Sequence, residues 1–211
     1  MTAPVAVLID FDGTMVNSET LGREVELNLL RSCGIVIEPD EFSRRYQNMS
    51  LLAFGEELSH LTGETRDWVA ELNVAYESLM RHQLRPHADV VAIVDALGHR
   101  RCIVTNSPRD YLLRKMAWAS LPLEWADRAV TSDDVSKVKP DPEPYLRALD
   151  LMGVTADGAV AIEDTSHGIQ SALAAGIATY GFAGGIESAA SLRENGVQVV
   201  EHWSAFRPIF W

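Results

Sequence analysis

Two aspartates stand one residue apart directly after a run of apolar residues near the start of the chain. The apolar run is Val5–Ile9, and the sequence DFDGT follows it as Asp10–Thr14. Residues two apart at the end of a strand point to the same side, so the carboxylates of Asp10 and Asp12 are expected to lie close together. Such a pair repels unless a cation lies between the carboxylates or one of them is protonated. The spacing therefore predicts a cation site, and a simple turn is the structural alternative.

Three further polar segments follow apolar stretches later in the chain. Thr105 ends one such stretch just before an expected helix start, and a helix N-terminus is suited to binding an anion. Lys139 lies on an extended segment, because the prolines that follow it delay any helix until about Glu143. Glu163 and Asp164 end another apolar stretch. Taken one at a time, these residues also fit a helix cap or a solvated lysine.

The four segments are chemically complementary when they are considered together. In an open parallel sheet, ligands bind beyond the carboxyl ends of the strands. Carboxylates hold a hard divalent cation such as Mg²⁺. A hydroxyl, backbone N–H groups and a lysine hold a phosphoryl group, and a carboxylate near both can attack phosphorus. The set therefore predicts phosphoryl-group chemistry at one edge of a sheet.

The elements that must position these residues alternate between strand and helix after residue 86. Short apolar segments predict strands at residues 5–10, 101–105, 159–162, 177–182 and 197–200, and residues 129–131 are a further short apolar segment. Helices are expected between them. One begins with Ser107 as its N-cap, one runs from Glu143 to Met152 and ends at Gly153, and one covers 166–175. This alternation predicts a parallel sheet with helices on both faces.

Residues 17–85 have a different pattern. Apolar residues recur there at helical spacing, and no strand pattern interrupts them. We therefore predict an α/β fold whose Rossmann-like parallel sheet core carries an inserted all-helical cap domain. The core is expected to comprise residues 1–16 and 86–211, and the cap residues 17–85.

The composition limits the possible partners and compartments. A net charge of −12 makes a nucleic-acid backbone an unsuitable partner. The two cysteines, Cys33 and Cys102, form no disulfide framework or CxxC motif, which favours a reducing compartment. The start of the chain has no basic segment of a signal peptide, and no apolar run is as long as a membrane span. We expect a cytoplasmic protein without a membrane partner, and a monomer is compatible with the sequence.

The four motifs and the helical insert together resemble the haloacid dehalogenase (HAD) superfamily, in the branch with a helical cap after the first strand. The resemblance covers essentially the whole chain. The motifs follow the family's order and spacing, and they are Asp10-x-Asp12-Gly13-Thr14, Thr105, Lys139-Pro140 and Glu163-Asp164. The segment 162–169, with Ala174-Ala175-Gly176 after it, is especially similar to the fourth motif.

The resemblance implies roles for the acidic residues. Asp10 would be the nucleophile that attacks phosphorus. Asp12 would be the general acid that protonates the leaving oxygen and then the base that activates water. Mg²⁺ would be held by the Asp10 carboxylate, the Asp12 backbone carbonyl and Asp164. Glu163 would support Lys139 or a water bound to the metal.

The resemblance also implies how the phosphoryl group is held. Thr105 and the Asn106 amide would bind phosphoryl oxygens, and Lys139 would neutralise charge on Asp10 and on the phosphoryl group. Lys137 is an alternative to Lys139, but Pro140 matches the family at Lys139. Val138 departs from the family, which commonly has glycine before the lysine.

Several residues distinguish between branches of the superfamily. Asp12 argues against a dehalogenase, because a halide leaving group needs no proton. The helical block contains no lysine, which argues against a phosphonate hydrolase that forms a Schiff base. Gly22 and Leu51 stand where β-phosphoglucomutases have a histidine and an arginine. We therefore expect a phosphatase for a small phosphorylated metabolite, such as a sugar phosphate or a phosphogluconate-like compound. A sugar phosphomutase and a catalytically silent binding module are the alternatives.

The cap segment 44–50 lies where this branch places its substrate-specificity loop. Gln47, Asn48 and Ser50 are the expected substrate contacts, and an exposed cap turn is the alternative. Asn17 stands where the family usually has aspartate, at the expected hinge of the cap. The helical block is expected to act as a lid that excludes bulk water.

Overall fold

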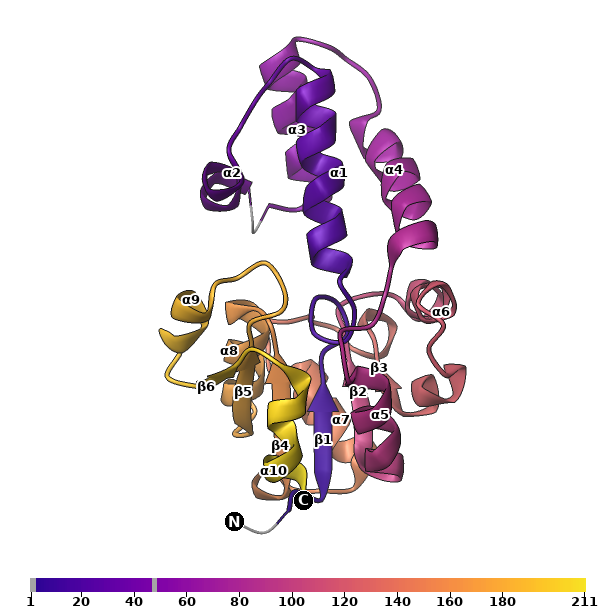
Figure 1. The fold of residues 1–211 in the computed structure, drawn as a ribbon, viewed down its shortest axis with the longest axis vertical. Helices are drawn as coiled ribbons and strands as arrows, with labels where there is room; N and C mark the ends of the chain where they lie inside the picture. Colours follow the sequence, from indigo (N-terminus) through magenta and orange to yellow (C-terminus); the bar gives the residue numbers. More distant parts are fainter. Residues whose placement is uncertain (1–2, 47–48) are drawn as a thin grey trace. The chain divides into compact units, whose positions relative to one another are not determined.

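The chain forms two compact units in a computed structural model that describes residues 3–46 and 49–211 (Figure 1). The core unit consists of Met1–Asn17 and Arg85–Trp211, and the helical unit consists of Ser18–Leu84. The chain passes between the two units after Asn17 and before Arg85. A hydrogen bond holds these two residues together, in which the Arg85 backbone N–H donates to Asn17 Oδ1 at 2.9 Å. None of the helices in the described ranges combines the length and apolar character that a membrane crossing requires.

The core unit is built on a six-stranded, fully parallel sheet, which confirms the predicted α/β fold. The strand order is β3-β2-β1-β4-β5-β6. The strands are β1 (Ala6–Ile9), β2 (Arg101–Val104), β3 (Ala129–Val130), β4 (Ala159–Glu163), β5 (Ala178–Phe182) and β6 (Gln198–Val200). The first strand lies in the middle of the sheet, where Leu8 pairs with Cys102 on one side and with Ala161 on the other.

Both faces of the sheet are covered, which explains why β1 is apolar at every position. All four residues of β1 are fully buried. On one face, Leu8 and its neighbours form a core with Tyr145, Ala148 and Ala172, from α7 (Glu143–Met152) and α8 (Ser166–Ala174). Figure 1 shows α5 (Val90–Leu97) and α10 (Arg207–Phe210) on the opposite side of the sheet. A strand buried on both faces is typical of parallel sheets.

The remaining helices of the core unit follow the loops that leave the sheet. They are α6 (Arg109–Trp118) and α9 (Ala189–Arg193), with 3₁₀ turns η1 (Gly98–Arg100), η2 (Leu123–Arg128), η3 (Ser132–Asp134), η4 (Ala156–Gly158) and η5 (Trp203–Phe206). Helix α7 has the predicted bounds. It ends at Gly153, which adopts the left-handed conformation with φ 65°. Helices often end at a residue in this conformation, and glycine adopts it most readily.

The prediction that Ser107 caps a helix is wrong. Helix α6 begins at Arg109, Pro108 occupies the N-cap position, and the first N–H of the helix, that of Arg109, donates to Asp133 Oδ2 at 2.9 Å. The physical reason is that the Ser107 hydroxyl is engaged elsewhere, because it donates a hydrogen bond to Asp12 Oδ2 at 2.9 Å. Ser107 therefore belongs to the polar groups around Asp12 at the edge of the sheet and does not cap the helix.

The helical unit contains α1 (Ser18–Ser32), α2 (Pro39–Tyr46), α3 (Leu51–Thr62) and α4 (Trp68–Gln83). Its helices have a hydrophobic core of their own. The aromatic rings of Phe42, Tyr46 and Phe54 pack against one another at its centre, with Trp68 and Leu72 buried beside them. A separate core of this kind is what allows a long insertion to be tolerated after the first strand.

Candidate active site

A tight loop carries the two aspartates away from the end of β1. Gly13 adopts a positive φ of 78° directly after Asp12, a conformation that other L-residues rarely adopt. Two side chains from distant segments hold the loop in place. His87 Nε2 lies 3.0 Å from the Gly13 carbonyl oxygen, and Trp203 Nε1 donates to the Thr14 carbonyl at 3.0 Å. The aromatic C-terminal segment therefore packs against the first motif.

Lys139 joins the first, second and fourth motifs inside the protein. Its Nζ donates to Asp10 Oδ1 at 2.7 Å and to the Val104 carbonyl at 2.7 Å, and it lies 2.6 Å from Glu163 Oε1. The hydroxyl of Tyr145 donates to the same Glu163 oxygen at 2.5 Å. Asp10, Lys139 and Glu163 are all buried. This network places a cation between two carboxylates at the carboxyl ends of β1 and β4.

The protonation equilibria of this network are strongly perturbed. Burial raises the pKa of Asp10, and Lys139 opposes this effect. Burial likewise raises the pKa of Glu163 to about 7, again against the influence of Lys139. Burial alone would lower the pKa of Lys139, but Asp10 and Glu163 outweigh it and raise that pKa above its ordinary value. Groups with perturbed pKa values that face one another are typical of functional sites.

Three carboxylates at this edge of the sheet can hold a metal ion. Oxygens of Asp10, Glu163 and Asp164 lie within 4.8 Å of one another, and all three residues are buried. Asp164 is oriented by Thr14, whose hydroxyl donates to its Oδ1 at 3.0 Å. Within the described ranges, the buried Asp10 Oδ2 has no hydrogen-bond partner. An all-oxygen donor set fits a hard divalent cation.

The second motif supports Lys139 through its asparagine. Asn106 Oδ1 accepts a hydrogen bond from the Lys139 backbone N–H at 3.0 Å, and Asn106 Nδ2 donates to the Lys139 carbonyl at 3.3 Å. Lys137 is directed elsewhere. Its side chain is 70% exposed, and its Nζ lies 3.4 Å from Asp141. Of the two lysines in this segment, Lys139 is therefore the one placed at the carboxylates.

Thr105 is buried at the end of β2 and belongs to the surroundings of Asp12. Its Oγ1 donates to Asp12 Oδ2 at 3.3 Å and accepts a hydrogen bond from the Ser107 N–H at 3.0 Å. The structure thus brings Asp10, Asp12, Thr105, Asn106, Lys139, Glu163 and Asp164 to the same edge of the sheet.

Lys115 contacts Asp12 but was not among the site residues predicted from the sequence. The Nζ of Lys115 contacts both carboxylate oxygens of Asp12 and the hydroxyl of Ser107. One signal could have revealed it. On α6, Lys115 stands between Leu112 and Met116 at the spacing of a buried helix face, where a lysine is unusual. Tyr145, the partner of Glu163, was also missed.

The cap residues expected to contact substrate are only partly visible. Gln47 and Asn48 lie outside the described residues. Ser50 is the N-cap of α3, and its side chain accepts a hydrogen bond from the Ala53 backbone at 3.2 Å. A role for Ser50 in substrate binding stays a prediction.

Gly168 is required by the packing of Glu163. A Cβ atom on Gly168 would lie 1.9 Å from Glu163 Oε2, whose carboxyl group is held by Lys139 and Tyr145. We expect Gly168→Ala to displace Glu163 and to lower the free energy of unfolding by about 1–3 kcal/mol. Urea denaturation measures this change.

The matched control for Gly168→Ala is Gly158→Ala. A Cβ atom on Gly158 would make only ordinary contact with Val5, at 3.8 Å. Its stability is expected to stay within about 0.5 kcal/mol of the wild type. Equal denaturation midpoints for the two variants would contradict this account of Gly168.

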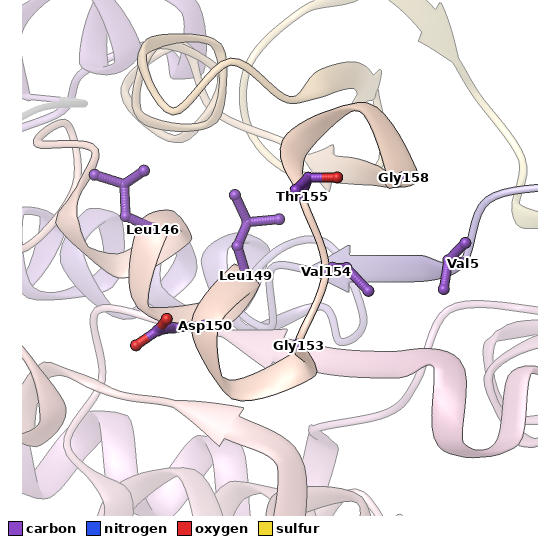
Figure 2. Close-up of a pocket in the computed structure, with 8 residues that line it drawn as sticks. All are labelled: Val5, Leu146, Leu149, Asp150, Gly153, Val154, Thr155 and Gly158. Atoms are coloured by element: carbon purple, nitrogen blue, oxygen red, sulfur yellow. The ribbon is translucent and has the colours of Figure 1, made fainter.

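One hollow in the core unit has unsuitable chemistry for a phosphate. It has a volume of about 480 Å³ and is shown in Figure 2, lined by Val5, Leu146, Leu149, Asp150, Gly153, Val154, Thr155 and Gly158. Val5 and Gly158 precede β1 and β4, so the hollow lies at the amino ends of the strands. Its lining includes one carboxylate and no cationic side chain. An anionic substrate is therefore not expected there.

Comparisons with known proteins agree with the geometry. Residues 7–182 match the family of haloacid dehalogenase-like hydrolases. The 6-phosphogluconate phosphatase of Escherichia coli (strain K12) is 25% identical over 84% of this chain and 81% of its own length. The validoxylamine A 7'-phosphate phosphatase of Streptomyces hygroscopicus subsp. limoneus is 30% identical over 81% of each chain.

A solved structure shows the same fold. A HAD family hydrolase from Deinococcus radiodurans R1 superimposes with a TM-score of 0.85 at 24% identity, covering 98% of this chain and 95% of that one. The family match spans most of the chain and includes all four motifs. The chain therefore belongs to the haloacid dehalogenase-like hydrolases.

Proposed function

We propose that this protein is a Mg²⁺-dependent phosphatase that hydrolyses a small phosphorylated metabolite through an aspartyl-phosphate intermediate on Asp10. One observation carries the proposal. Lys139 holds the buried Asp10 carboxylate through Oδ1, while Oδ2 of the same carboxylate has no hydrogen-bond partner in the described part of the chain. A nucleophile of this kind is oriented on one side and available on the other.

The first step transfers the phosphoryl group to the protein. A carboxylate oxygen of Asp10 attacks phosphorus, and the bond from phosphorus to the substrate oxygen breaks. Asp12 gives its proton to the leaving oxygen, so the alcohol departs in neutral form. Lys139 remains beside Asp10 and offsets negative charge that gathers around phosphorus, which is the main electrostatic demand of phosphoryl transfer.

The second step releases phosphate. The oxygen of a water molecule attacks phosphorus, and the bond between phosphorus and Asp10 breaks. Asp12, now a carboxylate, takes a proton from that water. Asp12 therefore returns to its protonated form, Asp10 returns to its carboxylate form, and the protein is ready for another substrate. The roles of Thr105 and the Asn106 amide in this scheme are to donate hydrogen bonds to the phosphoryl oxygens.

The metal would be held by Asp10 and Asp164, with the Asp12 backbone carbonyl and Glu163 as further contributors. Bound Mg²⁺ supplies positive charge that stabilises the anionic phosphoryl group. The proposal for Mg²⁺ rests on the oxygen-only donor set of the three carboxylates. The buried Glu163 also fixes Lys139, with 2.6 Å between Oε1 and Nζ, so its role combines both functions.

We propose a sugar phosphate or a phosphogluconate-like compound as the substrate class. The names of two relatives, 6-phosphogluconate phosphatase and validoxylamine A 7'-phosphate phosphatase, support a small phosphate ester. The helical unit would act as the cap, with Gln47, Asn48 and Ser50 contacting the part of the substrate that leaves. A cytoplasmic location is proposed because both cysteines, Cys33 and Cys102, are free thiols.

Phosphate release from a panel of small phosphorylated metabolites tests the proposed function. The panel is assayed with Mg²⁺ and again with a chelator. Release from at least one sugar phosphate that requires Mg²⁺ is expected. Transfer of the phosphoryl group to a sugar hydroxyl, without release of phosphate, would instead identify a phosphomutase. If no compound reacts and no phosphoenzyme forms, the proposal is wrong.

A further inference from the structure

Lys115 is a buried lysine that none of the four motifs contains. Its side chain is 2% exposed, and it comes from the middle of α6. The chain has three lysines in total, of which Lys139 serves the first carboxylate and Lys137 is exposed. A buried ammonium group costs several kcal/mol unless its charge and its three N–H donors are satisfied.

The partners of Lys115 are concentrated on Asp12. Its Nζ contacts both carboxylate oxygens of Asp12, with 2.5 Å to Oδ2, and it donates to Ser107 Oγ at 2.8 Å. The rings of Tyr111 and Phe11 lie 4.7 Å and 5.3 Å from the same nitrogen. These partners account for all three donors, so Lys115 acts through Asp12 and has no donor left for a substrate.

Ser107 completes the arrangement around Asp12. Its hydroxyl accepts a hydrogen bond from Lys115 and donates one to Asp12 Oδ2 at 2.9 Å. The Asp12 carboxylate is thus fixed from two sides, while its side chain is still 20% exposed. After the first step Asp12 is a carboxylate, and this is the form that pairs best with an ammonium group and accepts a proton from water.

Anchoring α6 does not explain a lysine at this position. Leu112 and Met116 on the same face of α6 are fully buried and already attach the helix to the core. A packing role alone would be filled by an apolar side chain at position 115, which would spare the helix the cost of burying an ammonium group. The placement of this cation on Asp12 therefore has a reason other than packing.

We propose that Lys115 is a positioning residue that holds the Asp12 carboxylate in the orientation in which it takes a proton from water. This inference rests on the proposed phosphatase function. It predicts that loss of Lys115 slows mainly the second step, the hydrolysis of the aspartyl phosphate. The first step should be slowed less when the leaving group of the substrate needs no proton.

The test compares Lys115→Met with the wild type on p-nitrophenyl phosphate, whose leaving group departs as an anion. The variant is expected to release p-nitrophenolate in a rapid burst of one equivalent per folded chain. Steady turnover then continues about 100-fold more slowly than in the wild type, at the lower end of what general acid–base groups contribute. Mass spectrometry after an acid quench should find the phosphoryl group on the variant protein.

Lys137→Met is the matched control, because it removes an exposed lysine whose Nζ lies 3.4 Å from Asp141, away from the Asp12 carboxylate. It should behave as the wild type. If Lys115→Met does not fold, Ser107→Ala removes another group that holds Asp12 and should show the same burst with a smaller slowing. Thermal unfolding of each variant reports whether it is folded.

Three results would overturn the inference. A Lys115→Met protein with the wild-type rate would show that the lysine has no role. If Lys115→Met loses activity without a burst or a phosphoenzyme, Lys115 only supports the fold. If Ser107→Ala loses activity in the same way, the inference is likewise wrong. Failure of the proposed function is distinguishable, because the wild type itself would then not hydrolyse p-nitrophenyl phosphate.

Discussion

The Asp10→Asn protein is expected to fold normally and to release phosphate more slowly than the wild type by a factor on the order of 10⁴ or more, as for removal of other catalytic nucleophiles. The amide has the shape of the carboxylate but is a very poor nucleophile, so no phosphoenzyme should form. The measurement is steady-state phosphate release with Mg²⁺, together with the mass of the acid-quenched protein.

A stability measurement distinguishes loss of the nucleophile from loss of the fold. Asp10 lies among buried carboxylates, and burial and the charge of Asp12 both raise its pKa, which shows that the ionised form is strained there. In chelator, the Asn variant should therefore unfold at a temperature no lower than the wild type. Retained activity in a preparation free of deamidated protein would contradict the role proposed for Asp10.

Lys139→Met is expected to lose both activity and stability. The substitution leaves Asp10 and Glu163 buried without their shared cation. Breaking a buried ion pair by removing one partner costs about 3–5 kcal/mol, so urea denaturation in chelator should show a loss of that order. Phosphate release should fall on the order of 1000-fold, because one positive group beside phosphorus is missing.

Magnesium provides an additional check on Lys139. A divalent cation bound to the same carboxylates would partly replace the missing charge, so Mg²⁺ should stabilise Lys139→Met more than it stabilises the wild type. Lys137→Met, which changes an exposed lysine on the same segment, should differ from the wild type in neither measurement. An equal loss of stability in both lysine variants would show that the network around Lys139 is unimportant.

The fold was predictable because its central features depend on local sequence. Four of the five apolar residues before Asp10 form β1, which is covered on both faces, and the short apolar run predicted such a strand. The end of α7 at Gly153 follows from the same kind of local rule, since glycine adopts a positive φ without strain. Parallel strands then bring their carboxyl ends to one edge, which places the four motifs together.

The contacts around Asp12 could not be predicted in this way. The spacing of Leu112 and Met116 indicates that Lys115 lies on a buried face of α6, but the residue that it meets there depends on the packing between distant elements. Ser107 was assigned to a helix cap because a serine before a proline usually has that role. Its hydroxyl instead contacts Asp12, a residue 95 positions earlier in the chain.

The position of β1 in the sheet has a consequence for synthesis of the protein. This strand is synthesised before the other strands of the sheet, yet its pairing residues lie on β2 and β4. Leu8 therefore pairs only after Cys102, and later Ala161, has been synthesised. The helical unit, which has its own hydrophobic core, is completed in the interval. A nascent chain stalled before residue 159 would therefore carry a folded helical unit beside an exposed apolar strand, and it would be a natural client for a chaperone.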